Sequence, residues 1–406
     1  MSGDLRRAEL ILMTSTEFAH TAQTLRSVWR YRRRRLLTWL VTITAGLLTS
    51  STFADGKSLV RVTDDSQDYI GRIVALDQAT CTLMDRQGRL VELDVTKLRS
   101  VKHLANRFRP DSPGDFRSQL KREFGKRYEV AGTTHYLVCG PKGHADNYAQ
   151  LFERIYREME QFYRVRGLHI QAPDVPLVAI VFAARKEFAD YCLRDNVTPS
   201  AGLKGYYSLV SNRVALFVDS ASFAAAGEND IRTEAIVALS GIAGQTTNTI
   251  IHETIHQVSY NVGIHSRLGK SPLWVVEGLA TVLEPSAIRS RRRSQSSAQR
   301  VNSERFNWFQ HQYRPGRPGG HLSQLIASDD AFRRQTLNAY SEAWAFTFFL
   351  LENPVPCRNF ATYLQRLARR DPSSTYSARN RLADFQAEFG DISRLEVQFL
   401  RFMDRL

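Results

Sequence analysis

Residues 246–285 read TTNTIIHETIHQVSYNVGIHSRLGKSPLWVVEGLATVLEP, and they carry the strongest chemical signal in the chain. At the centre of this stretch lie His252, Glu253 and His256. Residues i and i+4 of a helix share one face, so His252 and His256 can offer two imidazoles to one metal ion. Glu253 lies beside them and suits a general base that takes a proton from a polarised water molecule.

The pattern around these three residues predicts a helix. Ile250, Ile251, Ile255 and Val258 form an apolar stripe at helical spacing. Gly263 offers a stop after that stripe. The sequence therefore predicts that both histidines lie on one ordered element.

A second helix is predicted to begin at Ser271 and Pro272, a capping residue followed by proline at the first helical position. Glu277 lies in its apolar run, 21 residues after His256. A carboxylate in such a run needs a partner, and a metal is the obvious one. Two histidines, one carboxylate and one open position describe a catalytic zinc site, whereas structural sites more often use cysteines.

Two alternatives bear on this interpretation. The five-residue HExxH pattern recurs by chance, so an amphipathic surface helix with two histidines is the simpler explanation, but the downstream run WVVEGLA adds independent support for a metal site. The metzincin pattern is excluded, because Ser259 and Val262 occupy the positions where it requires glycine and histidine.

The chain resembles the gluzincin metallopeptidases, which pair HExxH with a distant glutamate in an E-G-[LF]-A-type helix, and more closely a bacterial branch of secreted, peptidase-like proteins. The resemblance covers about residues 130–355 and is strongest over 205–219, 250–285 and 340–352. It implies one zinc ion per chain, bound by His252, His256 and Glu277, with Glu253 as the general base.

The apolar segment 340–351 must pack in the core. In the family that the chain resembles, a helix with a Tyr-x-x-x-Trp pattern follows the zinc helices, and here Tyr340 and Trp344 match it. Tyr340 is then a candidate for the hydroxyl that stabilises the oxyanion of a tetrahedral intermediate. A packed, hydrogen-bonded structural tyrosine is an equal alternative.

Three further polar residues near the motif have weaker assignments. Metal-bound histidines usually donate their second N–H to a carboxylate or a carbonyl. Thr281, one turn after Glu277, and Asn261 are placed to support the site in this way. His265 is expected to be a loop residue rather than a metal ligand.

The chain of 406 residues is long enough for two or three domains, and its net charge is +14. Residues 1–54 hold eight arginines and three acidic residues, so +9 remains for the rest. Such a surface could favour anionic partners, but a solvated basic surface is the commoner outcome, and we expect no specific nucleic acid partner. The four cysteines are scattered without a CxxC pair, which excludes a zinc knuckle. They are buried free thiols or, in an exported protein, partly paired.

The N-terminal segment predicts export. Residues 30–35 are basic, residues 36–48 are apolar, and small residues lead to Ala54. This pattern indicates a signal peptide over 1–54, so we expect a periplasmic, cell-surface or secreted protein. A signal anchor is the alternative, and membrane attachment follows only if the signal is not cleaved.

Residues 55–100 change character and predict four short strands, which favours a small all-β barrel. The pattern resembles an SH3-like domain of the Sla-homology type, whose strands end in a Val-x-x-Leu element, here Val95 and Leu98. We expect an accessory or binding module there. Residues 101–127 are predicted to be a linker with one short helix.

The catalytic domain is predicted over residues 128–406. A hairpin at 205–219 precedes the HExxH helix, and in gluzincins a strand in this place forms the upper rim of the cleft, where a peptide can bind by strand addition. A simple core hairpin is an equal alternative. The arginine-rich segment 286–320 is predicted to be a mobile basic loop that could attract an acidic partner, or a solvated loop without that role.

The expected fold class is α+β, with a zincin-like domain (a small sheet plus helices carrying the motif) after the SH3-like barrel. The expected function is a zinc-dependent peptidase acting on a peptide or protein substrate. The alternative is an exported, non-catalytic binding or scaffold protein that retains a gluzincin fold.

Overall fold

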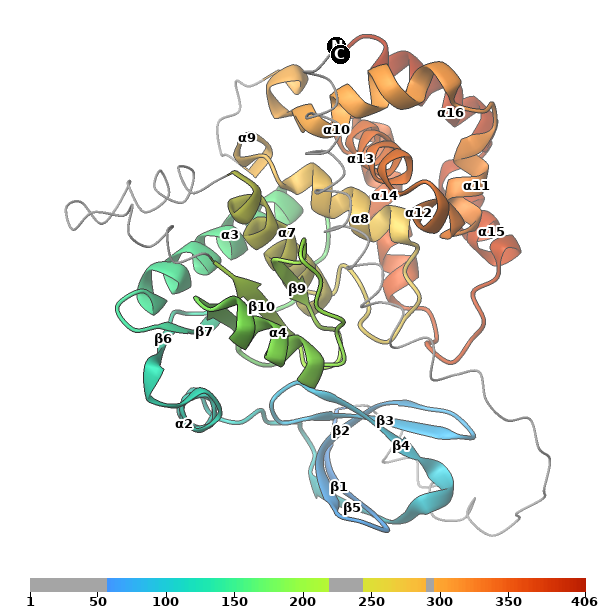
Figure 1. Ribbon diagram of the computed structural model, residues 1–406. Coiled ribbons are helices and arrows are strands. Elements are labelled where there is room, and N and C mark those ends of the chain that lie inside the picture. The colour runs from blue at the N-terminus through green and yellow to red at the C-terminus, as the bar shows by residue number, and fades with distance from the viewer. Residues whose placement is uncertain (1–56, 219–243, 290–295) are drawn as a thin grey trace.

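The computed structural model describes residues 57–218, 244–289 and 296–406, which form a mixed α+β structure with two small sheets and many helices (Figure 1). The predicted signal segment 1–54 lies outside the described residues. Within them, no helix is long and apolar enough to cross a lipid bilayer. The predicted α+β class is confirmed at this level.

The N-terminal sheet is antiparallel throughout, in the order β4-β3-β2-β1-β5. Its strands are β1 (Leu59–Asp64), β2 (Asp68–Leu76), β3 (Thr80–Asp85), β4 (Leu90–Asp94) and β5 (Leu98–Ala105), with the short 3₁₀ helix η2 (Val95–Lys97) before the last. Alternate residues such as Val60, Val62 and Leu83 point into one apolar core. The four predicted strands are present, and β5 is an addition to them.

The predicted linker 101–127 is more ordered than expected. Its first residues belong to β5, which pairs with β1 from far along the chain, and neighbouring residues alone do not specify such pairing. The helix α2 (Pro113–Phe124) follows, then the 3₁₀ helix η3 (Gly125–Arg127). Ser112 caps α2, because its hydroxyl accepts the Asp115 N–H at 3.2 Å while the Asp115 carboxylate accepts the Ser112 N–H at 3.1 Å.

The second sheet is mixed, in the order β6-β7-β8-β10-β9. Its strands are β6 (Tyr128–Gly132), β7 (Tyr136–Pro141), β8 (Leu177–Phe182), β9 (Gly205–Tyr207) and β10 (Arg213–Phe217). The central strands β7, β8 and β10 run parallel, and all six residues of β8 are buried. The hairpin expected at 205–219 is present as β9 and β10, and β9 lies at one end of the sheet.

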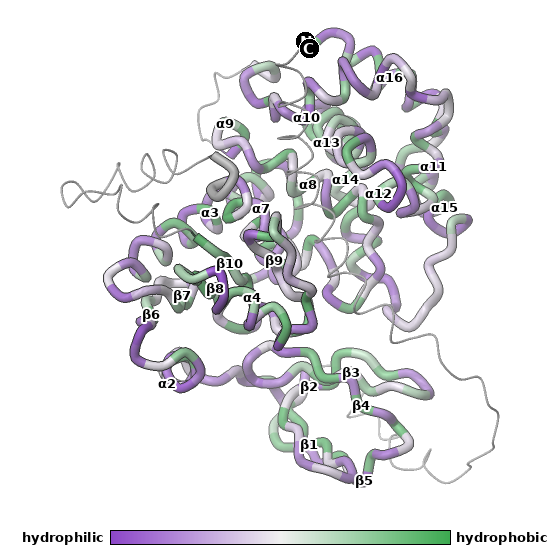
Figure 2. The backbone as a smooth tube through the Cα atoms, viewed as in Figure 1, coloured by the Kyte–Doolittle hydropathy of each residue, from purple (hydrophilic) through white to green (hydrophobic). Residues whose placement is uncertain are grey.

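Helices surround the second sheet and form the C-terminal part of the molecule (Figure 1). Their bounds are α3 (Ala145–Val165), α4 (Arg185–Arg194), α7 (Gly244–Asn261), α8 (Leu273–Leu283), α9 (Ser286–Arg289), η4 (Ser297–Arg300), α10 (Ser303–Asn307), η5 (Trp308–Tyr313), η6 (Arg314–Gly316), α11 (His321–Ala327), α12 (Asp330–Arg334), α13 (Thr336–Glu352), α14 (Pro354–Ala368), α15 (Ala378–Phe389) and α16 (Ile392–Met403). In Figure 2 the central helices carry long hydrophobic stretches, whereas outer helices such as α16 alternate in hydropathy.

The central contact of the helical part joins α8 to α13. Every α8 residue from Trp274 to Leu283 is buried, so this helix has no solvent-facing side. A Cβ built on Gly278 would lie 2.6 Å from the Ala343 carbonyl oxygen and 2.3 Å from the Thr347 hydroxyl. The glycine therefore lets the two backbones approach closely, directly beside Glu277.

The segment 286–320 differs from the predicted mobile basic loop. Its described part is a series of short helices, and several of its arginines form internal ion pairs. Arg289 pairs with Glu158 at 2.9 Å, Arg300 with Glu352, and Arg317 with Glu342. Sequence could not show this, because the acidic partners come from distant helices. The predicted acidic partner of this segment stays a prediction, with fewer unpaired arginines available for it.

The N-terminal sheet is joined to the second sheet at two turns. The Leu90 N–H donates to the Val210 carbonyl at 2.9 Å, which connects the start of β4 to the β9–β10 turn. Arg267 donates to the Gly88 carbonyl at 2.8 Å and to the Leu209 carbonyl, so one guanidinium holds both turns. Gly88 has a φ of +81°, which favours glycine at this close approach.

All four cysteines lie in the described part of the chain and are free thiols. Cys81, Cys139 and Cys192 are buried, and Cys357 is partly buried. The sequence left free thiols and partial disulfide pairing as alternatives, and the structure shows free thiols.

The close approach of α8 and α13 predicts a specific sensitivity to volume. We expect Gly278→Ala to lower the free energy of unfolding by about 1–3 kcal/mol, because the added methyl group overlaps the Ala343 carbonyl. The matched control is Gly316→Ala, where a Cβ meets nothing within 4 Å, and its effect should stay within about 0.5 kcal/mol. Denaturant unfolding measures both, and equal effects would contradict this account of the packing.

Candidate metal centre

Helix α7 presents the two histidines of the motif on one face. His252 and His256 are both buried, and their rings meet edge-on with centroids 4.5 Å apart. Their Nε2 atoms are 2.9 Å apart. Two neutral imidazoles would bring two lone pairs together at this distance, so the arrangement needs a proton or a metal cation between the rings.

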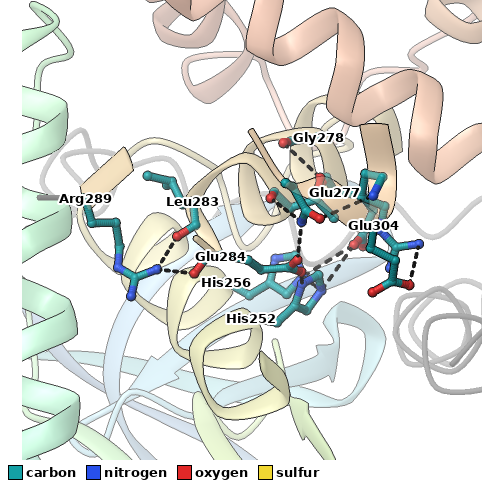
Figure 3. A network of polar contacts seen from close by, with 11 residues as sticks. His252, His256, Glu277, Gly278, Leu283, Glu284, Arg289 and Glu304 are labelled. Carbon is teal, nitrogen blue, oxygen red and sulfur yellow. Dashed lines mark hydrogen bonds and ion pairs between the residues drawn. The ribbon is translucent and has the colours of Figure 1, made fainter. Parts of the chain in front are cut away.

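Helix α8 brings the third side chain. Glu277 is completely buried, and its Oε2 atom lies 3.4 Å from His252 Nε2 and 3.5 Å from His256 Nε2 (Figure 3). Among the described residues, these three side chains are the group of metal-binding type whose ligand atoms all lie within 4.8 Å of one another. The structure thus brings together the two histidines and the distant glutamate that the sequence singled out.

The donor set fits a zinc ion. Zinc bonds of about 2.0–2.1 Å at tetrahedral angles place neighbouring ligand atoms about 3.3 Å apart. The two carboxylate–imidazole distances match this spacing, and the distance between the two Nε2 atoms must lengthen slightly. Neither Glu277 oxygen has a hydrogen-bond partner of standard geometry in the described part of the chain, although both are buried. A cation would satisfy that carboxylate.

Electrostatics at the three residues favour a cation as well. Burial opposes charge on Glu277, but the two neighbouring histidines outweigh it and lower the pKa of this carboxyl to about 2. Burial likewise opposes charge on His252, but the nearby carboxylates of Glu277 and Glu284 raise its pKa to about 10. The surroundings of both groups therefore stabilise positive charge at the point where they meet.

Glu284 belongs to the site but was not singled out from the sequence. Its Oε1 atom lies 2.8 Å from His252 Nδ1 (Figure 3). Its Oε2 atom accepts the Asn302 side-chain N–H at 2.7 Å. A carboxylate at Nδ1 holds that proton there and leaves the Nε2 lone pair directed at Glu277. Glu284 comes seven residues after Glu277, which is two helical turns, so this spacing was a usable signal.

Arg289 and Asn302 hold the end of α8 in place. Arg289 donates to the backbone carbonyls of Leu283 and Glu284, which lie at the last turn of the helix. The Asn302 side chain also donates to the Thr281 carbonyl at 3.1 Å. The segment predicted as a loop therefore supports Glu284 from outside.

The two supporting residues predicted from sequence have other partners. The Thr281 hydroxyl donates to the Glu277 carbonyl of its own helix at 2.7 Å. The Asn261 side chain bonds Asn212 at 2.8 Å and lies at the end of α7. These hydrogen bonds place neither of them at an imidazole, so Glu284 fills the role expected of them.

Glu253 lies beside the two histidines and is 2% exposed. Its Oε2 atom accepts the Tyr207 backbone N–H at 2.8 Å, so the end strand β9 fixes the position of this carboxylate. Burial raises the pKa of Glu253, while the positive charges of His252 and His256 oppose that shift. A carboxyl with a raised pKa in such a place is suited to accept and return a proton near neutral pH.

Tyr340 lies near the centre, on α13. It is 1% exposed, and its ring packs edge-on against Phe332 at 5.3 Å. Burial and the negative charge of Glu277 raise the pKa of Tyr340 well above its ordinary value, which keeps the hydroxyl protonated. The buried Arg305 guanidinium lies 5.9 Å from the Tyr340 ring centroid and was not singled out from sequence.

His265 lies in the loop after α7, as expected, and it is 3% exposed. It is not a member of the metal-binding group described above. Its ring packs against Tyr260 with centroids 5.1 Å apart, and burial lowers its pKa to about 3. His265 is therefore a neutral residue beside the site.

Comparison with known families gives one match. Residues 246–374 match a family described as a protein of unknown function, DUF1570. The matched part runs from α7 to the end of α14, so it contains all three residues of the metal-binding group. A search of curated proteins finds no match to this chain.

The Glu284 contact predicts an effect on metal affinity. We expect Glu284→Gln to weaken zinc binding about 10–100-fold, because His252 loses the carboxylate that fixes its Nδ1 proton. Competition with a chelator of known zinc affinity measures this. The control is Glu92→Gln, a substitution of the same kind at an exposed carboxylate of β4, and it should leave the affinity unchanged. An unaltered affinity in Glu284→Gln, with the fold intact, would show that this contact does not orient His252.

Proposed function

We propose that this protein is a zinc-dependent peptidase of the gluzincin type. The observation that carries the proposal is the convergence of His252, His256 and Glu277 from two helices, with Glu253 fixed beside them. Two histidines and one carboxylate leave a coordination position open, as in catalytic zinc sites. When bound, zinc would polarise a water molecule and a substrate carbonyl.

The chain's own residues have distinct roles in this mechanism. Glu253 takes a proton from the attacking water and later gives it to the leaving amine. The β9 backbone keeps the Glu253 carboxylate directed at the reacting group through the Tyr207 N–H. Tyr340 donates a hydrogen bond to the oxyanion, because its raised pKa keeps the hydroxyl protonated.

Strand β9 supports the proposal as a place for peptide binding. It is the last strand of its sheet, and the Tyr207 N–H is directed to Glu253 rather than to β10. A peptide chain that extended the sheet at this edge would lie along the same side as Glu253. We therefore propose a peptide or protein as the substrate.

The further proposals concern the N-terminal part. The order β4-β3-β2-β1-β5, with a 3₁₀ helix before the last strand, supports an SH3-like accessory module. The basic and apolar segments before Ala54 support export, in the periplasm, at the cell surface or in secreted form.

Metal content is the first test of the proposal. We expect about one zinc ion per chain in the purified mature protein and a large loss in His256→Ala, since that variant lacks one of three protein ligands. Elemental analysis measures both. Zinc removal by a chelator should abolish peptide cleavage, and added zinc should restore it. A full complement of zinc in folded His256→Ala would contradict the assignment of this ligand.

The general base provides the second test. We expect Glu253→Gln to keep its zinc and to cleave peptides about 10²–10⁴-fold more slowly than the wild type, because the amide cannot accept the proton. Mass spectrometry of a mixed peptide library measures cleavage. If the wild type and Glu253→Gln are equally inert with one zinc per chain, the non-catalytic binding protein becomes the better account.

Tyr340→Phe separates a catalytic hydroxyl from a packing role. We expect it to keep the fold and the zinc and to lower kcat about 10²-fold, as for loss of one oxyanion donor. Tyr156→Phe is the matched control, because Tyr156 is also buried but lies on α3, stacked on His135. Equal effects in the two variants would assign Tyr340 to packing alone.

A further inference from the structure

A cavity of about 470 Å³ lies where the N-terminal sheet meets the end of α7. One wall comes from strands β2, β3 and β4, and a second from the end of α7 and the loop after it. A third comes from the C-terminal end of α14. The segment between α3 and β8 supplies a fourth wall through residues such as His169 and Gln171. Four parts of the chain thus enclose one space, and nothing in the mechanism described above uses it.

The cavity borders the metal-binding group along α7. Tyr260 lines the cavity and comes four residues after His256, so the two side chains share one face of the helix, one turn apart. The Tyr260 ring packs on His265, which also lines the cavity. A ligand in the cavity would therefore lie one helical turn from the group that holds the metal.

The charges around this cavity are unbalanced. Its lining contains three arginines and one carboxylate, Asp174, which is paired with Arg72. Arg267 donates its hydrogen bonds to backbone carbonyls, and no carboxylate of the described chain lies within ion-pair distance of it. Arg369 is exposed and also has no ion-pair partner among the described residues. Two guanidinium groups at the cavity thus form no ion pair with a carboxylate of the described residues.

The buried histidine adds a polar atom without a partner. His265 is 3% exposed, and its Nδ1 atom is buried without a hydrogen-bond partner within the described residues. Buried polar atoms are nearly always paired in folded proteins, because an unpaired one loses its contact with water. A ligand that reached the wall formed by His265 could supply the missing partner.

A second, larger cavity of about 830 Å³ lies between α2, α4 and the same sheet, and its charges are more nearly balanced. Its five arginines face four carboxylates. Arg213 pairs with Glu123 at 2.9 Å, and Arg86 pairs with Asp111 at 3.2 Å. The imbalance of arginines over carboxylates is therefore greater at the smaller cavity beside the metal-binding group.

We propose that the smaller cavity binds a carboxylate group of a peptide, with Arg369 and Arg267 supplying the positive charge. This inference rests on the proposed function in one respect, since it makes the cavity a specificity site for acidic substrates. Carboxylate is the anion that peptides offer, and it pairs well with guanidinium groups. The carboxylate has two sources, an Asp or Glu side chain and the C-terminus of the peptide.

Binding of three N-acetylated tripeptides distinguishes these sources. The first is Ala-Glu-Ala with an amidated C-terminus, the second is Ala-Gln-Ala with a free C-terminal carboxylate, and the third is the amidated Ala-Gln-Ala. Calorimetry on the zinc-loaded Glu253→Gln chain avoids cleavage, and a repeat after zinc removal separates this cavity from the metal. We expect one of the carboxylate peptides to bind at least tenfold more tightly than the neutral one, with and without zinc.

The variant Arg369→Gln tests the residues themselves. We expect it to weaken binding of the preferred peptide about tenfold, the change for loss of one charge-assisted hydrogen bond, and to leave the neutral peptide unaffected. Arg358→Gln is the matched control, because Arg358 is an exposed arginine of α14, the helix that Arg369 directly follows, and it lines neither cavity. It should change nothing.

Two outcomes would overturn this inference. One is equal affinity for all three peptides. The other is a carboxylate preference that disappears with zinc and ignores Arg369→Gln, which would place the carboxylate at the metal and leave the proposed function standing. A preference that depends on Arg369 in a chain that cleaves no peptide would instead retain the cavity site and remove the proposed function.

Discussion

One buried contact organises the molecule: the Glu277 carboxylate facing the Nε2 atoms of His252 and His256. A fully buried carboxylate is costly unless positive charge or hydrogen-bond donors surround it. The two imidazoles supply part of that compensation, and a bound cation would supply the rest. Glu277 is buried because α8 is covered on all sides. Helix α13 covers α8 next to Glu277, where Gly278 lets the two backbones approach closely.

Around that contact, the second sheet and the C-terminal helices fix different parts of the centre. The sheet acts through β9, whose Tyr207 N–H holds Glu253. The helical segment after α8 acts through Asn302, which holds Glu284 against His252. Glu253 and His252 are thus each oriented by a neighbour from another part of the chain, which helps a site keep its geometry when a substrate binds.

The arginine side chains of the structure make two kinds of contact. Arg289, Arg300 and Arg317 pair with buried or partly buried carboxylates and act as internal ties between helices. Arg267 instead joins the β3–β4 turn to the β9–β10 turn through backbone carbonyls, and it forms no ion pair with a carboxylate among the described residues. The ion pairs between helices stabilise the fold. The bonds of Arg267 to backbone carbonyls leave its positive charge for a ligand.

The sequence by itself determined the helices of the motif, four of the N-terminal strands and the ligand-type residues, because these depend on local spacing: His252 and His256 one turn apart, Glu277 in an apolar helix, and alternating residues in the strands. It did not determine β5, the ion pairs of 286–320, or the partners of Glu253 and His252, because each joins residues far apart in the chain. Only the tertiary structure decided that Glu277 meets both imidazoles, since side-chain distances across two helices depend on how closely their backbones pack. The same reason applies to Glu284. Its spacing from Glu277 is visible in the sequence, but only the packing of the helices shows that it contacts His252.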